Sequence, residues 1–194
     1  MDPKYVLYSP PLPDLGMSEN LIEMLPKGGT GLVFITGLTG SGKTTTANSY
    51  ARYLGENFNQ SLAAIMNPKE FKYFDNTNWV LMLGETEFGQ EIAAINEAIS
   101  MRPDVILIDD IYSPDAFELA VKASSASLVI FTHHAGNLTE ALKNHENYVS
   151  LSSNPAEVES LLRKNLQLIL CEEIHQTSHI TWSGEFKTFI PKPK

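Results

Sequence analysis

Residues 31–55 read "GLVFITGLTGSGKTTTANSYARYLG", and this segment is the most informative about the fold. Its apolar residues 32–36 predict a buried strand, and residues 42–54 predict a helix that ends near Gly55. Between them the chain fits the pattern G-x-x-x-x-G-K-[ST]. The alternative is a glycine-rich turn that holds no ligand, but the strand before and the helix after favour a loop that wraps phosphate groups. The fixed positions of this pattern are Gly37, Gly42, Lys43 and Thr44.

The residue types in this loop predict how it contacts a nucleotide. Glycines allow backbone N–H groups to turn toward phosphate oxygens, and the start of the following helix adds unpaired donors. Lys43 is expected to contact the β- and γ-phosphates, and Thr44 to hold Mg²⁺ through its hydroxyl. We therefore expect ATP and Mg²⁺ as cofactors. The expected nucleotide-binding residues are Gly37, Thr39, Gly40, Ser41, Gly42, Lys43, Thr44 and Thr45.

A pair of acids follows a second buried strand in "VILIDD", residues 105–110. In an open α/β sheet, ligands bind at the carboxyl ends of the strands, where Asp109 and Asp110 are expected to lie. Asp109 is expected to reach the Mg²⁺ through water, and Asp110 to orient or deprotonate the attacking water. A pair of acids that only ends a strand or caps a helix would give the same pattern.

The rest of the chain alternates between continuous apolar runs and segments with helical spacing. This alternation predicts an α/β fold with a mostly parallel sheet flanked by helices. Ser18 is expected to cap a short helix. Residues 155–174 form a long amphipathic segment, which we interpret as a helix, and alternating runs around Ser183 and Gly184 predict a small C-terminal hairpin. The other expected strands are 61–66, 80–83, 104–109 and 127–132, and the other expected helices are 89–100, 114–124 and 137–145.

Composition excludes several classes of protein. The chain has 194 residues and a net charge of −9, without a cluster of lysine or arginine, which argues against nucleic acid as a partner. No apolar run is long enough to cross a bilayer, and the N-terminal residues do not resemble a signal peptide. We therefore expect a cytoplasmic location without membrane insertion. The single cysteine, Cys171, allows no internal disulfide and is expected on a helix as a small apolar residue.

In serial order, the segments of this chain resemble the ATPases of type II and type IV secretion systems, including the pilus-retraction motors. "AAIMNPKEF" (63–71), "RPDVILIDDI" (102–111) and "FTHHAG" (131–136) resemble the family's acidic box I-E-D-P-I-E-[FY], its segment D-P-D-[IV]-I-L-V-G-E and its histidine box T-L-H-T. The resemblance covers most of residues 12–190. It implies a RecA-like P-loop NTPase domain, a motor subunit that hydrolyses ATP, a homo-oligomer such as a hexameric ring, and platform proteins at the inner face of the cytoplasmic membrane.

The sequence departs from this family in the acidic box and in the histidine box. Met66 and Asn67 replace a Glu-Asp pair whose glutamate prepares the attacking water in the family, and a methionine cannot accept a proton. Glu70 matches the later acid of the box, and His134 matches the family's histidine near the γ-phosphate. We expect Lys43, Asp110, Glu70 and His134 to be catalytic. Either the Asp109–Asp110 pair has taken over the role of the lost acid, or the chain binds nucleotide and cleaves it weakly.

The chain has three arginines, Arg52, Arg102 and Arg163. In the family an N-terminal domain usually supplies arginines to the nucleotide, and we expect none of those arginines in this sequence. If a neighbouring subunit supplies one, we favour Arg163. The scarcity also disfavours a small-molecule kinase, a further alternative, because its lid would clamp phosphates with arginines. The expected division is a lead-in segment 1–27, a nucleotide-binding motor domain 28–175, and a hairpin and tail 176–194.

Overall fold

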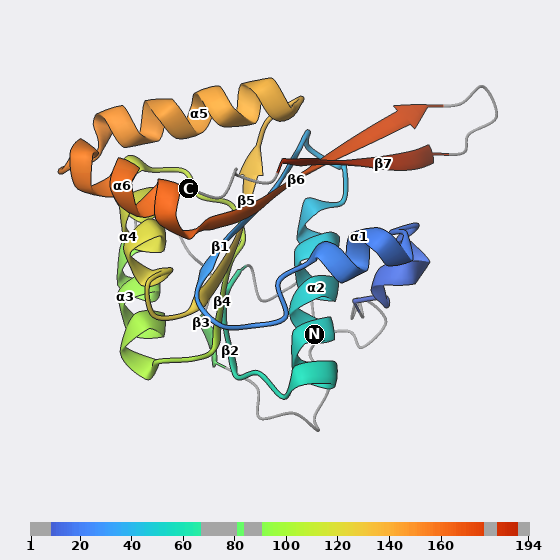
Figure 1. Cartoon of the computed structure of the whole chain (residues 1–194), viewed down its shortest axis with the longest axis horizontal. Helices are drawn as coiled ribbons and strands as arrows, with labels where there is room; N and C mark the ends of the chain where they lie inside the picture. The colour runs from blue at the N-terminus through green and yellow to red at the C-terminus, as the bar shows by residue number, and fades with distance from the viewer. Residues whose placement is uncertain (1–8, 67–80, 84–90, 177–181, 190–194) are drawn as a thin grey trace, which may run out of the picture.

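The computed structural model describes residues 9–66, 81–83, 91–176 and 182–189, and within these ranges seven strands form one sheet (Figure 1). The order across the sheet is β3-β2-β4-β5-β1-β6-β7, and every neighbouring pair is parallel except β6 and β7. The strands are β1 (Gly31–Gly37), β2 (Leu62–Ile65), β3 (Leu81–Leu83), β4 (Val105–Ile108), β5 (Leu128–His134), β6 (Leu166–Gln176) and β7 (Trp182–Phe189).

Helices cover both faces of this sheet, which confirms the predicted α/β fold with a mostly parallel sheet. One face is covered by the 3₁₀ helix η2 (Leu12–Leu15), α1 (Glu19–Met24) and α2 (Lys43–Phe58). The other face is covered by α3 (Glu91–Met101), α4 (Pro114–Ala123), α5 (Leu138–Leu151) and α6 (Pro155–Asn165). Successive residues of β1 alternate between the two sides. Val33 and Ile35 belong to the core cluster under α2, and Leu32 and Phe34 belong to the cluster on the opposite side.

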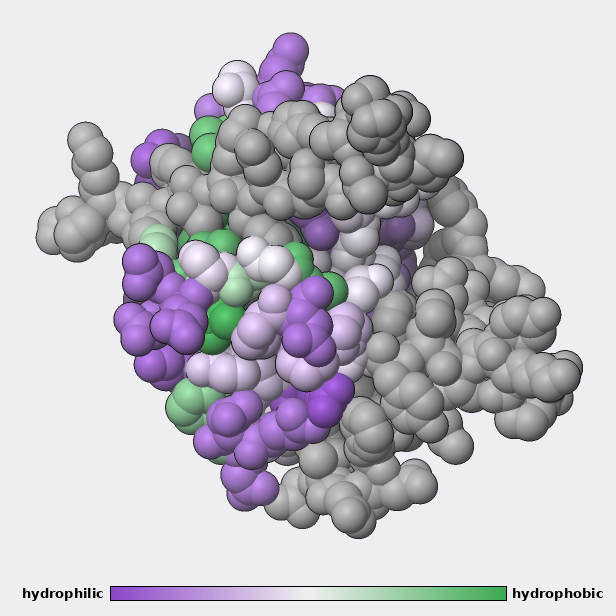
Figure 2. Space-filling view, turned by 90° about the vertical axis from the view of Figure 1, so that its right-hand side faces the viewer, coloured by the Kyte–Doolittle hydropathy of each residue, from purple (hydrophilic) through white to green (hydrophobic). Residues whose placement is uncertain are grey.

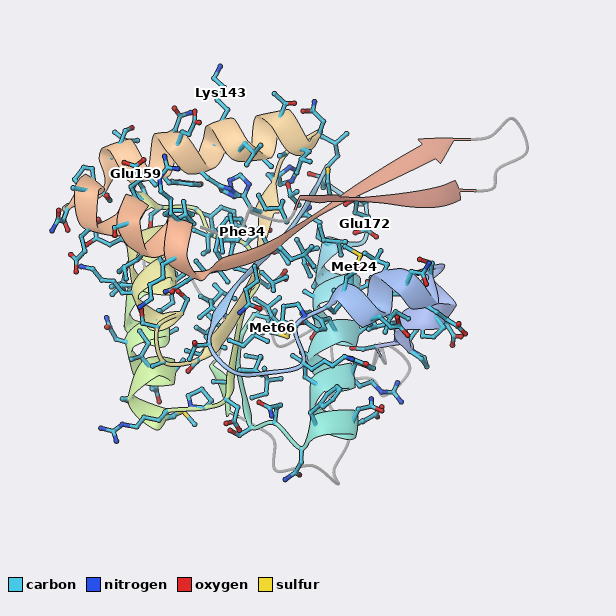
Figure 3. All side chains as sticks on the ribbon, in the orientation of Figure 1. Met24, Phe34, Met66, Lys143, Glu159 and Glu172 are labelled. Atoms are coloured by element: carbon cyan, nitrogen blue, oxygen red, sulfur yellow. The ribbon has the colours of Figure 1, made fainter. Side chains whose placement is uncertain are left out.

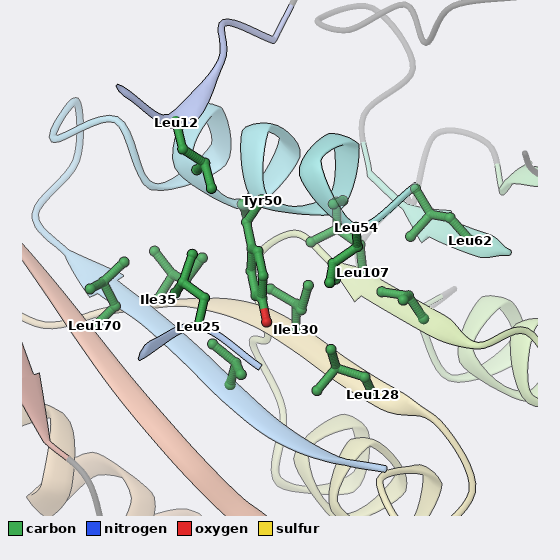
Figure 4. Close-up of a cluster of buried hydrophobic side chains, with 14 of the residues drawn as sticks. Leu12, Leu25, Ile35, Tyr50, Leu54, Leu62, Leu107, Leu128, Ile130 and Leu170 are labelled. Carbon is green, nitrogen blue, oxygen red and sulfur yellow. The ribbon is translucent and has the colours of Figure 1, made fainter. Parts of the chain in front are cut away.

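The core under α2 also includes residues that precede β1 (Figure 4). Leu12 and Leu25 are buried there beside Tyr50 and Leu54 of α2. The hydroxyl of Tyr50 donates a hydrogen bond to the carbonyl of Pro26. Burial of the ring raises the pKa of Tyr50 well above its usual value. These contacts attach the segment before β1 to the helix that follows the phosphate loop.

The predicted helix over 155–174 is wrong in its second half. The helix α6 ends at Asn165, and the next residues form β6, which pairs with β1 from Leu32 to Gly37. A short apolar run such as residues 166–171 fits a buried strand as well as a buried helix, and only the open edge of β1 decides between them. Cys171 therefore lies buried on a strand of the sheet rather than on a helix.

Other element boundaries also differ from the prediction. The helix α5 continues to Leu151, six residues beyond the predicted end at 145. The C-terminal hairpin exists, but Ser183 and Gly184 lie within β7, opposite His175 and Ile174, so they do not form its turn. The helix α2 does not end near Gly55 but continues to Phe58, where Asn59 adopts a left-handed conformation with φ of 51°. Asparagine tolerates this conformation, so it serves as the helix end that we had assigned to glycine.

The coloured part of the surface in Figure 2 is hydrophilic over most of its area, with hydrophobic residues in smaller areas between. Within the described ranges, no helix has the length and apolar character that a membrane crossing needs.

Candidate functional site

The phosphate loop joins the end of β1 to the start of α2. Gly40 and Gly42 have φ angles of 78° and 107°, a left-handed conformation that glycine adopts without strain. Lys43 is 7% exposed, and its Nζ donates to the carbonyl of Leu38 at 3.0 Å. The loop therefore folds around the ammonium group of its own lysine, as expected for a loop that presents backbone N–H groups to an anion.

Gly37 is required because the loop folds back closely over it. A Cβ atom at this position would lie 2.7 Å from the carbonyl oxygen of Glu172 and closer still to Ser41 Oγ. The other expected binding residues follow directly along the chain: Thr39 and Gly40 are exposed, Ser41 is buried, and Thr45 is half-buried in the first turn of α2.

The structure brings Thr44 and Asp109 together. Thr44 Oγ1 donates to Asp109 Oδ1 at 2.9 Å, from the start of α2 to the residue after β4. Thr132 on β5 donates to the same Asp109 Oδ1 at 2.8 Å. Hydroxyl and carboxylate oxygens are hard ligands of the kind that Mg²⁺ prefers. The described residues contain no group of three or more His, Cys, Asp or Glu side chains that could hold a metal, so phosphate oxygens and water would have to complete its ligands.

Asp110 makes different contacts from Asp109. Its φ is 60°, and its backbone N–H donates to Thr132 Oγ1 at 2.7 Å. Its Oδ2 accepts a hydrogen bond of 2.9 Å from the hydroxyl of Tyr112, a side chain that is 59% exposed. Partial burial and this bond raise the pKa of Tyr112 well above its usual value, so the phenol stays a donor. Tyr112 is a contact that was not predicted from the sequence, although it stands two residues after the acid.

The two adjacent histidines of β5 have different environments. His134 is exposed, and its Nε2 shares a hydrogen bond of 2.7 Å with Thr39 Oγ1 of the phosphate loop. His133 is buried and lies 5.4 Å from the ring of His145 on α5. Burial lowers the pKa of His133 to about 4. Because neighbouring residues of a strand point to opposite sides, only His134 reaches the phosphate loop.

Glu172 is a further acid at this loop that sequence reasoning missed, because residues 155–174 were interpreted as a helix with a polar face. Its Oε1 accepts a hydrogen bond of 3.3 Å from Thr46 Oγ1, one turn into α2. Figure 3 shows Glu172 where β6 passes the N-terminal end of α2. Burial raises the pKa of Glu172 to about 7, against the opposing effects of the Thr46 hydroxyl and the Lys43 charge.

The other predicted residues are not assembled at the loop by any described contact. Met66 is buried at the end of β2, whereas Asn67 and Glu70 lie outside the described residues, so the role of Glu70 stays a prediction. Arg52 donates to Ser9 and Glu56, and Arg163 pairs with Glu159, which Figure 3 shows on α6 away from Glu172. Arg102 ends α3 with φ of 52°.

Comparisons with known proteins agree with this geometry. The family model for "Type II/IV secretion system protein" matches residues 12–181. An uncharacterized protein of Escherichia coli K12, YggR, is 27% identical over 164 residues, which cover 82% of this chain and 48% of that protein. The type IV pilus retractation ATPase PilT of Pseudomonas aeruginosa is 29% identical over 171 residues, covering 84% of this chain and 46% of that protein. The chain spans about half the length of these curated relatives.

Solved structures show the same fold. The pilus retraction motor PilT with bound ADP superposes with a TM-score of 0.83 at 22% identity, covering 98% of this chain and 55% of that one. The ATPase DotB of Legionella pneumophila superposes with a TM-score of 0.79 at 21% identity, covering 94% of this chain and 51% of that one.

Proposed function

Because the chain belongs to the type II/IV secretion system protein family, we propose that it binds ATP with Mg²⁺ at the phosphate loop and hydrolyses it as a motor subunit. The observation that carries this proposal is the hydrogen bond between Thr44 and Asp109 beneath a loop that folds around Lys43. It unites the two features that P-loop enzymes require, a cradle for phosphates and a carboxylate beside the metal-binding hydroxyl.

When the nucleotide binds, Lys43 exchanges a hydrogen bond within the protein for contacts with the phosphates. Lys43 Nζ, now on the carbonyl of Leu38, turns to the β- and γ-phosphates, and backbone N–H groups of the loop complete the cradle. Thr44 would hold Mg²⁺ through its hydroxyl and Asp109 would reach it through water, and the metal would supply positive charge against the charge that develops on the phosphates. Thr132 keeps Asp109 in place from the neighbouring strand.

Hydrolysis needs a group that prepares the attacking water, and we assign this role to Asp110. Its carboxylate is oriented by the hydroxyl of Tyr112, and its backbone is held by Thr132. We also assign to His134 the sensing of the terminal phosphate, and its hydrogen bond with Thr39 in the phosphate loop supports this role. Positioning and electrostatic stabilisation supply most of the catalysis in phosphoryl transfer. Glu70 remains a candidate for a second acid.

We further propose that the chain works in a homo-oligomer, such as a hexameric ring, at the cytoplasmic face of the membrane. Its partners would be the membrane platform proteins of a secretion or pilus machine. Loss of the γ-phosphate would then shift the balance between two arrangements of neighbouring subunits.

A second candidate is a module that binds nucleotide but turns it over weakly. The observation that favours it is Met66, which occupies the acidic-box position, is 2% exposed, and has no group that accepts a proton. Such a module would regulate or assemble a machine that other subunits drive.

Steady-state phosphate release with ATP and Mg²⁺, together with ADP titration, separates these functions. Lys43→Ala should abolish ADP binding, whereas Asp110→Asn should keep it and remove turnover. Glu159→Gln, which removes one charge from the exposed face of α6, is the matched control and should change neither. Binding without phosphate release in the unaltered protein would establish the second candidate, and absence of ADP binding would refute both. Specific activity that rises with protein concentration would report assembly.

A further inference from the structure

The buried acid Glu172 lies directly against the loop that holds the phosphates. Its carboxyl group reaches the start of α2 from the neighbouring strand β6 and contacts Thr46 through Oε1. The approach is close, because a Cβ atom at Gly42 would lie 2.9 Å from Glu172 Oε1. An acid in this place adds negative charge to a site that must attract a polyphosphate.

The surroundings of Glu172 do little to stabilise a negative charge. Glu172 is 8% exposed, and its Oε2 is buried without a hydrogen-bond partner among the described residues. The residues paired with it in β1 and β7 are Gly37 and Phe186, neither of which ionises. A buried carboxylate that lacks donors favours its neutral form.

Lys43 of α2 is the charged group that stabilises the ionised form of Glu172 in the described part of the chain. In the proposed function this ammonium group turns to the phosphates. Glu172 then loses the positive charge of Lys43 that stabilises its ionised form and gains several negative charges at the same time. Both changes favour the neutral form of Glu172, because nearby negative charges and the loss of a counter-ion destabilise a carboxylate.

We propose that Glu172 links nucleotide binding to protonation: when a polyphosphate occupies the loop, the carboxylate takes one proton from solvent and stays neutral in the complex. This inference rests on the proposed nucleotide binding and adds to it a dependence of affinity on pH near neutrality. In the protonated state Oε2 becomes a donor beneath the loop instead of an unpaired acceptor.

Burial raises the pKa of Glu172 to about 7 in the absence of nucleotide, so a solution at pH 8 holds mostly the ionised form. If the bound polyphosphate raises this pKa by one unit, the chain with protonated Glu172 binds it about ten times more tightly than the chain with ionised Glu172. The affinity is highest below pH 7 and falls as the pH rises, because binding above pH 7 requires the uptake of a proton.

The test is calorimetric titration of MgADP at pH 6, 7, 8 and 9 into the unaltered chain and into Glu172→Gln, which is neutral at every pH. We expect the ratio of the variant's association constant to that of the unaltered chain to rise about tenfold from pH 6 to pH 9. Comparing the two proteins cancels the titration of the nucleotide itself. Titrations at pH 8 in two buffers of different ionisation enthalpy should show uptake of about 0.4 proton by the unaltered chain, which a shift of one pKa unit gives at this pH, and less by the variant.

Glu159→Gln is the control for a change of net charge and should follow the unaltered chain at every pH. A ratio that is the same from pH 6 to pH 9, with equal proton uptake in both proteins, would overturn this inference and leave the proposed function standing. Absence of MgADP binding by the unaltered chain and the variant at every pH would overturn the proposed function and this inference with it. If Glu172→Gln fails to fold, Glu172→Met, which is also neutral, replaces it with the same expected ratio.

Discussion

Two buried histidines should lower the free energy of unfolding as the pH falls, and replacing His145 with phenylalanine should remove about half of this effect. The imidazole of His145 on α5 is 3% exposed and lies 4.0 Å from the ring of Phe34. Among the described residues, neither of its ring nitrogens has a hydrogen-bond partner. Phenylalanine matches its aromatic neighbours and carries no polar atom, so it should fit this place.

The magnitude follows from the difference in pKa between the folded and unfolded chain. Burial lowers the pKa of His145 to about 3, whereas a histidine in an unfolded chain titrates near its usual pKa of 6.5. The unfolded chain therefore binds more protons below pH 6.5, and the free energy of unfolding falls as the pH decreases. Between pH 8 and pH 5 this costs about 2 kcal/mol, since one pKa unit corresponds to about 1.4 kcal/mol.

His133, whose pKa burial lowers to about 4, loses a similar amount over the same interval. Together the two histidines should lower the free energy of unfolding by about 4 kcal/mol between pH 8 and pH 5. In His145→Phe about 2 kcal/mol of this loss should remain, from His133 alone.

Urea denaturation at pH 5, 6, 7 and 8, followed by circular dichroism, measures these differences. Tyr148→Phe is the matched control, because it changes the same aromatic cluster and removes the hydroxyl that donates to the Ile111 carbonyl. Its effect, about 1 kcal/mol, should be the same at every pH because no proton binding changes in this range. If His145→Phe loses as much stability between pH 8 and pH 5 as the unaltered chain, the reasoning from burial is refuted.

Three further substitutions test the site and its supports. Gly37→Ala should abolish ADP binding, measured by titration, because the added Cβ would collide with Ser41 and with the backbone of Glu172. Binding at unchanged affinity would show that the loop does not lie as close to Gly37 as the structure has it. Thr132→Val should lower the free energy of unfolding by about 1–3 kcal/mol and reduce phosphate release, because it removes one hydrogen-bond donor from Asp109 and the acceptor of the Asp110 N–H. Thr132→Ser, which keeps the hydroxyl, should behave like the unaltered chain in both assays. Ser113→Ala should cost about 1 kcal/mol in urea denaturation, because Ser113 caps α4 by accepting from the Ala116 N–H; an unchanged midpoint would show that this cap contributes nothing.

Local chemistry explains why much of the fold could be predicted. The cap Ser113 and the following Pro114 place the start of α4, and Ser18 places the start of α1, because a helix begins where a side chain satisfies its first N–H groups. The glycine pattern of the phosphate loop is similarly short in sequence and demands particular backbone angles. Continuous apolar runs predicted the buried parallel strands, because both faces of such strands are covered.

The site could be predicted only in part. The strand-end rule placed Asp109 and Asp110 at the correct edge of the sheet but did not distinguish their contacts. Asp109 meets Thr44 across 65 positions of sequence, whereas Asp110 turns to Tyr112 because of its left-handed backbone. The contact of Asp110 with Tyr112 is local in sequence, whereas the contacts of Asp109 with Thr44 and Thr132 depend on how α2 and β5 lie beside β4.

The phosphate loop, the helix that follows it and the alternation of strands and helices can be predicted from the sequence, because these features depend on residues close along the chain. The strand over residues 166–176 could not be predicted in this way, because its apolar run fits a buried helix equally well. It becomes a strand because β1 offers unpaired backbone groups beside it. That pairing also brings Glu172 beneath a loop more than 120 residues away and buries it there, which gives an ordinary acid an unusual pKa.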